Sequence, residues 1–183
     1  MESETTNFKN ILLVEDDPRD VELTLTALEE HHLANRVEVV DNGAKALDYL
    51  YHRGKFKMRA GGHPILVLLD LKMPKVNGLE VLKLIKADEL LKIIPVVILT
   101  SSREMPDLVE CYKHGVNAYV VKPVDFGEFM EAVKQLGIFW AMVNEPPIAT
   151  GRESTLIRCN EPMASGRKEI QHEIPTAHPA PGG

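Results

Sequence analysis

The chain of 183 residues has no excess of basic residues, no long apolar run and only two cysteines, and each of these features argues against a class of protein. Its 21 basic side chains are outnumbered by 27 acidic ones, and a net charge of −6 argues against binding nucleic acid by neutralising phosphates. The longest apolar run, 138–143, is far shorter than the roughly 20 residues that cross a bilayer. The start, MESETTNFKN, lacks the pattern of a signal peptide, and two cysteines make no disulfide framework. We therefore expect a cytoplasmic protein with no nucleic-acid or membrane partner.

The last 40 residues differ from the rest in composition. Residues 144–183 hold six of the twelve prolines, few large apolar residues and no helical or strand period. Such a segment cannot bury enough apolar surface to offset its ordering entropy. The sequence thus predicts one folded domain over residues 7–143 and a disordered, proline-rich tail over 144–183, with a docking motif in the tail as an open alternative.

Within the predicted domain, apolar runs alternate with helical patterns. The expected strands are Ile11–Val14, Arg36–Val40, Ile65–Leu69, Val96–Leu99 and Ala118–Val121. The expected helices begin after Asp17 and end near His32, span Ala44–His52, Leu79–Lys86 and Pro106–His114, and begin again at the capping box Asp125–Glu128. Five such units predict an α/β fold, a doubly wound (βα)5 parallel sheet in the order 2-1-3-4-5.

Polar side chains follow four of the expected strands, and parallel strands end at one edge of a sheet. Glu15 and Asp16 follow the first strand, Asp70 the third, Thr100 ends the fourth and Lys122 follows the fifth. Clustered carboxylates repel one another, and a bound Mg²⁺ ion commonly offsets this repulsion. With Lys122 as a point charge and Thr100 as a donor, Asp70 could accept a phosphoryl group. Each of these residues alone could be a solvated loop residue, but their occurrence together at the ends of four strands favours a functional site.

The segments ILLVEDDP, LVLLDLKMPKVNG, VVILTSS and AYVVKP resemble the receiver domain of bacterial two-component response regulators, over about residues 9–143. The resemblance implies a flavodoxin-like fold and a single-domain response regulator in a phosphorelay. Such a protein accepts a phosphoryl group from a sensor histidine kinase, signals through protein contacts and is not an enzyme in the ordinary sense.

The resemblance also assigns the acidic residues. It implies that Glu15 and Asp16 are the metal-binding acid pair, that Asp70 is both the phosphoacceptor and a metal ligand, and that the backbone carbonyl of Lys72 completes the Mg²⁺ shell. Asp17 remains open between a helix N-cap and a third ligand, with the cap favoured.

Further roles are implied for residues of the last two strands. Thr100 and Lys122 would contact the phosphoryl group, and Tyr119 would turn inward as a switch when Thr100 moves. Ser102 lies where the family tunes dephosphorylation. The Lys122–Pro123 peptide bond is expected to be cis.

The last helix carries an apolar stripe made of Phe129, Val133, Leu136, Trp140 and Val143. Ile138, Phe139 and Met142 fall off this stripe, so the helix end is apolar nearly all round. Exposed patches of this kind usually have a partner. We expect a homodimer through the last helix, with Phe139, Trp140 and Met142 at the interface. The alternative is that the tail covers the patch.

A long basic loop over 51–64 and the aromatic pair at 139–140 resemble the stand-alone regulators that partner phytochrome histidine kinases. The loop on its own is either a solvated connection or a kinase contact.

Two other functions remain as alternatives. One is a constitutive dimeric scaffold with a vestigial site, which the complete set of site residues disfavours. The other is a Mg²⁺-dependent phosphohydrolase with an aspartate nucleophile, which would carry a second acid two residues after Asp70, where Lys72 stands.

Overall fold

The computed structural model describes residues 10–29, 37–59, 62–123 and 125–144. The predictions for the tail and for a helix end near His32 therefore fall outside the described residues, apart from Asn144. No helix in the described part of the chain is both long and apolar enough to span a membrane.

In the described ranges, five strands and five α-helices alternate, as the sequence predicted. The strands are β1 (Ile11–Val14), β2 (Val37–Val40), β3 (Leu66–Leu69), β4 (Val96–Thr100) and β5 (Ala118–Val121). The helices are α1 (Pro18–Glu29), α2 (Gly43–Leu50), α3 (Gly78–Ala87), α4 (Met105–Lys113) and α5 (Phe126–Ile138). A 3-10 turn, η2 (Gly54–Phe56), lies in the long basic loop, and a π-helical turn, η3 (Phe139–Val143), continues α5.

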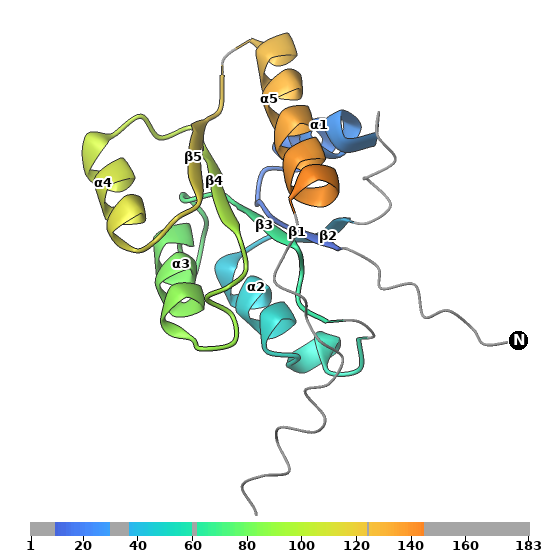
Figure 1. The fold of residues 1–183 in the computed structure, drawn as a ribbon, viewed down its shortest axis with the longest axis vertical. Coiled ribbons are helices and arrows are strands. Elements are labelled where there is room, and N and C mark those ends of the chain that lie inside the picture. The colour runs from blue at the N-terminus through green and yellow to red at the C-terminus, as the bar shows by residue number, and fades with distance from the viewer. Residues whose placement is uncertain (1–9, 30–36, 60–61, 124, 145–183) are drawn as a thin grey trace, which may run out of the picture. The chain divides into compact units, whose positions relative to one another are not determined.

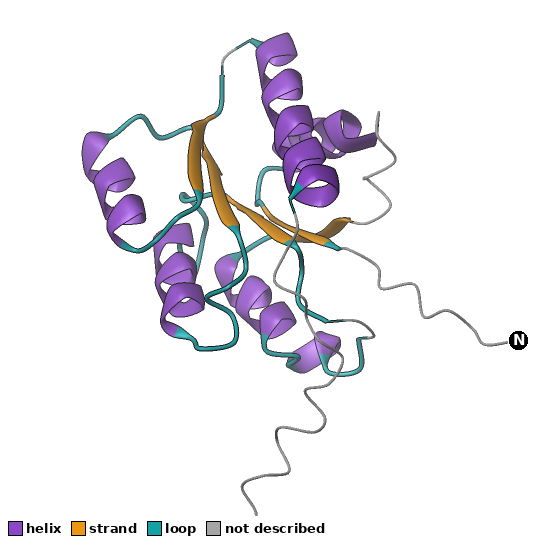
Figure 2. Ribbon diagram, viewed as in Figure 1, coloured by secondary structure: helices purple, strands orange, loops and turns teal. Residues whose placement is uncertain are grey.

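The strands form one parallel sheet in the order β2-β1-β3-β4-β5 (Figures 1 and 2). In the register, Leu13 of β1 lies between Val39 of β2 and Leu68 of β3. The predicted fold class and strand order are confirmed.

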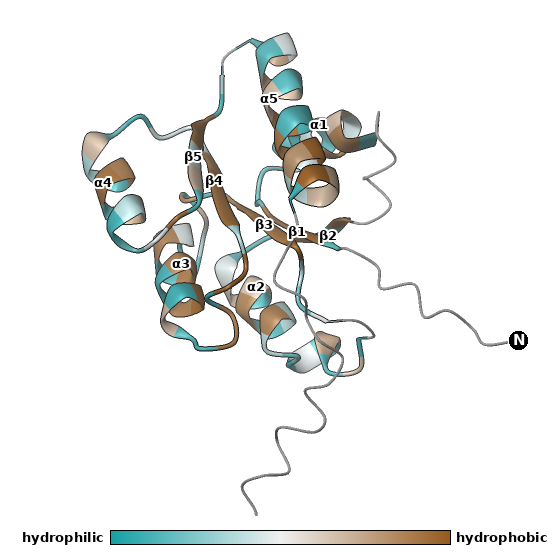
Figure 3. Ribbon diagram, viewed as in Figure 1, coloured by the Kyte–Doolittle hydropathy of each residue, from teal (hydrophilic) through white to brown (hydrophobic). Residues whose placement is uncertain are grey.

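Side chains of the three central strands alternate between two cores, because successive residues of a strand point to opposite faces. Leu12, Val67 and Ile98 belong to the core on the face of α2, α3 and α4. Leu13 and Leu68 belong to the core beneath α1 and α5. Figure 1 shows these two helix layers on either side of the sheet, and Figure 3 shows the strands as its most hydrophobic part. Burial on both faces explains the continuous apolar runs.

Side-chain caps mark where α3 and α5 begin. The Asn77 side chain accepts from the backbone N–H of Glu80 and the Glu80 carboxylate accepts from that of Asn77, a complete capping box. Asp125 accepts from the backbone N–H of Glu128 in the same way.

The end of the last helix differs from the prediction at one residue. Phe129 and Val133 are buried as expected, but Val143 is 62% exposed and Ala141 is buried instead. The π-helical turn explains the change, because its wider spacing shifts the residues after Phe139 around the axis.

A second expectation was wrong. The Lys122–Pro123 peptide bond is trans, as are the other peptide bonds in the described ranges. The trans form is the lower-energy isomer of most X-Pro bonds.

Candidate functional site

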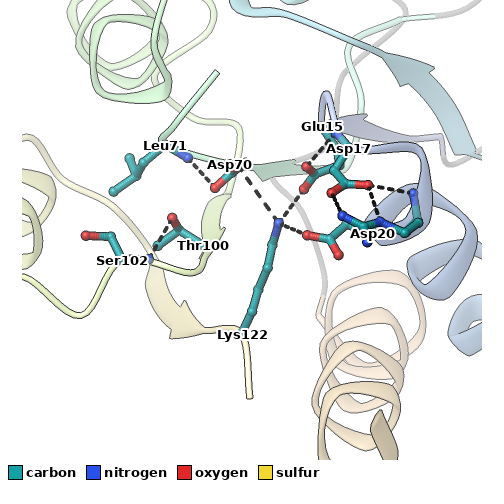
Figure 4. Close-up of polar contacts among 9 residues, drawn as sticks. Glu15, Asp17, Asp20, Asp70, Leu71, Thr100, Ser102 and Lys122 are labelled. Atoms are coloured by element: carbon teal, nitrogen blue, oxygen red, sulfur yellow. Dashed lines mark hydrogen bonds and ion pairs between the residues drawn. The ribbon is translucent and has the colours of Figure 1, made fainter. Parts of the chain in front are cut away.

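Four strand ends bring the predicted polar residues to one edge of the sheet (Figure 4). Glu15 follows β1, Asp70 follows β3, Thr100 ends β4 and Lys122 follows β5. Backbone hydrogen bonds join these strand ends. The N–H of Asp70 donates to the Val14 carbonyl, and the N–H of Lys122 donates to the Thr100 carbonyl at 2.7 Å. The sheet therefore fixes the relative positions of the side chains.

Three carboxylates form the one acidic cluster with metal-ligand spacing that the described residues contain. Glu15, Asp16 and Asp70 each offer an oxygen, and these oxygens lie within 4.8 Å of one another. Glu15 and Asp70 are buried, whereas Asp16 is exposed. Bonds of about 2.1 Å to Mg²⁺ put opposite ligands about 4.2 Å apart, so a small closure of the side chains suffices. Oxygen donors with one solvent-facing member fit a hard divalent cation that keeps some water.

Asp70 is held by the loop that follows it. One carboxylate oxygen, Oδ1, accepts from the backbone N–H of Leu71 at 2.8 Å. The loop turns back at once, because the N–H of Gly78 donates to the Leu71 carbonyl at 3.0 Å. A Cβ on Gly78 would overlap the backbone carbonyl of Asp70, so this position requires glycine. The glycine in the Asp-x-x-Met-Pro-x-x-x-Gly motif thus packs the start of α3 directly against the site.

The Lys122 ammonium lies among three carboxylates, two from the β1–α1 segment and one that follows β3. Its Nζ is 2.6 Å from Glu15 Oε2, 2.6 Å from Asp20 Oδ2 and 4.0 Å from Asp70 Oδ2. The sequence predicted the first and third of these neighbours. Asp20, an acid in the first turn of α1, was not among the predicted site residues. Its position one turn into that helix, after a site-bearing strand end, was the available signal.

Burial and ion pairing act in opposite directions on these groups. Burial raises the pKa of Glu15, against hydrogen bonding and attraction from Lys122, which lower it. For Lys122, burial lowers the pKa, but hydrogen bonds to Asp20 and Glu15 and the charge of Asp70 outweigh it, so the pKa is raised. The ammonium therefore stays charged at neutral pH, as a group that neutralises an anion must.

Thr100 is fully buried and begins a chain of polar contacts that leads to α4. Its Oγ1 accepts from the backbone N–H of Ser102 at 3.2 Å. The Ser102 hydroxyl donates to Asp107 Oδ2 at 2.6 Å, and the Tyr119 hydroxyl donates to the Ser102 carbonyl at 3.1 Å. The two predicted switch residues, Thr100 and Tyr119, are therefore linked through Ser102. Asp107 is a member of this chain that the sequence did not indicate.

Two further predictions concern the loops around the acids. Asp17 is the helix cap: its Oδ1 accepts from the backbone N–H of Arg19 at 2.9 Å, and it is not part of the acidic cluster. The Lys72 ammonium lies 3.6 Å from Glu104. The expected role of the Lys72 carbonyl as a metal ligand stays a prediction.

Together these residues provide a nucleophilic carboxylate, acidic oxygens for a cation, a fixed ammonium and a buried hydroxyl on one rigid edge. This set suits transfer of a phosphoryl group to a carboxylate. The chain belongs to the response regulator receiver domain family, whose model matches residues 11–134. It is therefore a response regulator receiver protein, which accepts phosphoryl groups in signalling and is not a conventional enzyme, and it has a cognate histidine kinase.

Its similarity to individual proteins extends over about three quarters of the chain. The probable methanogenesis regulatory protein FilR2 of Methanothrix harundinacea is 41% identical over 140 residues, 75% of this chain and 86% of that protein. The bacteriophytochrome response regulator RtBRR is 60% identical, with a TM-score of 0.62, over 77% of this chain and 85% of that one.

A third similar protein was solved with a metal ion. Response regulator Rcp1 of Synechocystis is 34% identical over 140 residues, 76% of this chain and 94% of that protein. The Mn²⁺-bound form of response regulator Rcp1 gives a TM-score of 0.68 over 76% of this chain and 99% of that one. The chain is thus homologous to a bacteriophytochrome response regulator and to a response regulator solved with Mn²⁺.

Proposed function

We propose that Asp70 is the residue that receives the phosphoryl group from the histidine kinase. The observation that carries this proposal is the position of its carboxylate, which is buried at the end of a central strand, within 4.8 Å of two other acids and 4.0 Å from a fixed ammonium. Oδ1 is engaged by the Leu71 N–H. Oδ2 faces Lys122 and is the oxygen that attacks phosphorus.

The cation that this site binds is Mg²⁺, held by the carboxylates of Glu15, Asp16 and Asp70 and by the carbonyl of Lys72. A bound divalent cation would neutralise the charge that develops on the phosphoryl oxygens. Lys122 and Thr100 supply an ammonium and a hydroxyl to the same oxygens. Inward movement of Thr100 would pull on Ser102 and release Tyr119, which changes the surface of β5 and α4.

The kinase partner is of the phytochrome class, and the protein works in the cytoplasm as a homodimer through the last helix. Similarity to a bacteriophytochrome response regulator supports the first of these statements, and the free, buried thiol of Cys111 fits a reducing compartment. Exposed Phe139 and Met142 at the end of α5 support the dimer, and the acidic net charge favours a protein partner over nucleic acid. Phosphotransfer from a bacteriophytochrome kinase, faster than from a histidine kinase of another class, tests the partner.

The phosphoacceptor role is tested with acetyl phosphate as the donor. With Mg²⁺, the intact mass of the protein should increase by one phosphoryl group. The adduct should be absent when EDTA removes the metal and absent in Asp70→Asn, which keeps the shape of the side chain. An adduct of equal yield in Asp70→Asn, or no adduct on the native chain, contradicts the proposal.

A further inference from the structure

The ammonium of Lys122 is held from one side by two carboxylates of the β1–α1 segment. Glu15 and Asp20 each lie 2.6 Å from Nζ, while Asp70 lies 4.0 Å away, beyond hydrogen-bond distance (Figure 4). The Lys122 side chain is only 9% exposed, so these contacts are poorly screened by water. Its position relative to Asp70 is therefore set by Glu15 and Asp20.

These two acids are not equivalent. Glu15 belongs to the acidic cluster that would bind a cation, and a cation that engages its carboxylate competes with Lys122 for it. Asp20 lies outside that cluster and contacts Lys122 through Oδ2. Asp20 can therefore keep its contact with the ammonium whether or not a cation is bound.

The separation of Lys122 from Asp70 matters for the nucleophile. With Asp20 removed and Glu15 shared with a cation, less negative charge would oppose the attraction of the ammonium toward Asp70 Oδ2. Lys122 would then close the 4.0 Å gap and form a direct ion pair with Oδ2. An oxygen that accepts such a charge-assisted hydrogen bond is a weaker nucleophile, and the ammonium would occupy the space a phosphoryl oxygen needs.

We propose that Asp20 is a positioning residue, which holds the Lys122 ammonium away from Asp70 so that the carboxylate stays free to attack and a phosphoryl oxygen can enter between them. This inference rests on the proposed role of Asp70. It gives a function to an acid of α1 that otherwise has only a favourable place in the helix dipole.

The test compares three variants. Asp20→Ala removes the contact, and Asp20→Glu restores a carboxylate with a longer reach. Asp17→Asn is the matched control, because it removes one negative charge from the same segment, keeps a helix-capping side chain, and affects a group paired with Arg19. Three quantities are measured for each: the rate of phosphorylation by acetyl phosphate, Mn²⁺ affinity from the EPR signal of the free ion, and the ¹⁵N resonance of Lys122 Nζ.

Loss of a nearby negative charge alone should leave phosphorylation by an anionic donor unchanged or faster, as expected for Asp17→Asn. Asp20→Ala should instead be slower by roughly tenfold, the scale of one charge-assisted hydrogen bond, and Asp20→Glu should recover part of the rate. Mn²⁺ affinity should match that of Asp17→Asn, and the Lys122 Nζ resonance should move only in Asp20→Ala.

Two results would overturn the inference. Phosphorylation of Asp20→Ala at the rate of Asp17→Asn would mean that only the total charge matters. A selective loss of Mn²⁺ affinity in Asp20→Ala would make Asp20 a metal ligand instead. A native chain that is not phosphorylated at all defeats the proposed function, whereas the resonance of Lys122 still reports whether Asp20 positions the ammonium.

Discussion

At the scale of single residues, the site balances burial against charge. Lys122 and Glu15 are both nearly inaccessible to water, and such a pair is costly to desolvate unless its hydrogen bonds are complete. Asp20 supplies the ammonium with a second acceptor for its three N–H donors, beside Glu15. A protein that needed only stability could place apolar side chains here, so the polar set is better explained by its chemistry.

Cys111 lies on the buried face of α4, and the reactivity of its thiol tests this burial. Cys111 is fully buried, and burial raises its pKa from an ordinary value of 9.0 to about 11. In a Cys159→Ser variant, alkylation by iodoacetamide should be slow in the native state and should still increase with pH above 9. Rapid labelling in denaturant is the control. A labelling rate that levels off near pH 9 would contradict the buried environment.

The raised pKa of Cys111 also predicts how the free energy of unfolding depends on pH. Because the folded-state pKa of the thiol lies above its ordinary value of 9.0, its contribution to the free energy of unfolding is complete below about pH 9. That contribution is lost as the pH rises through about 11, since the unfolded chain ionises more readily.

Individual site residues differ in how far the sequence could predict them. Glu15, Asp70, Thr100 and Lys122 were predictable because strand ends of a parallel sheet share one edge. Asp20 was not, because its role depends on which way a side chain leaves the first turn of a helix. Its position one turn into α1 indicated that it lies near the site, but not the direction of its side chain.

At the scale of elements, the loop between β3 and α3 is tightly packed beside the site. Gly78 packs against the backbone of Asp70, and Gly43 at the start of α2 packs against the backbone of Val76 in the same loop. The loop is thus held between the starts of two helices. This explains why a nine-residue motif that begins at Asp70, the proposed phosphoacceptor, ends in glycine.

Gly78→Ala tests this packing. The added Cβ would overlap the Asp70 carbonyl, so we expect the free energy of unfolding to fall by about 1–3 kcal/mol, the usual cost of overpacking. Chemical denaturation measures it. Gly62→Ala is the matched control, since a Cβ there meets no atom within 4 Å. Equal stability of the two variants would show that the loop can move away from α3.

The end of α5 was only partly predictable. The apolar stripe through Phe129 and Val133 was correct because it follows the ordinary helical period. The π-helical turn that follows changes this period, and nothing in the sequence indicated it. Its effect is to expose Val143 beside Phe139 and Met142, which were expected to be exposed.

The exposed helix end is the expected dimer interface. Replacing Phe139 and Met142 together with alanine should lower the mass measured by sedimentation equilibrium toward that of a monomer, because both side chains leave water on pairing. Phe126→Ala is the matched control, since Phe126 is a comparably exposed phenylalanine at the other end of the same helix. A dimer that survives the double substitution would place the interface elsewhere.

At the scale of the whole molecule, topology turns separate short motifs into one site. The order β2-β1-β3-β4-β5 places β1 and β3 side by side at its centre, and the acids follow these two strands. The fold could be predicted from the sequence because apolar, strand-like runs alternate with helical patterns and because capping residues mark where helices begin. Distances such as the 4.0 Å between Lys122 and Asp70 depend on packing across the whole sheet and needed the structure.

The central claim is that Asp70 carries the phosphoryl group. The most direct measurement is to phosphorylate the native chain with acetyl phosphate and Mg²⁺, reduce it with borohydride, and locate the product by peptide mass spectrometry. Reduction converts an aspartyl phosphate to homoserine, so the account predicts homoserine at position 70 and unchanged acids at 15, 16 and 20. Homoserine at one of these other positions, or a phosphate that borohydride does not remove, would contradict it.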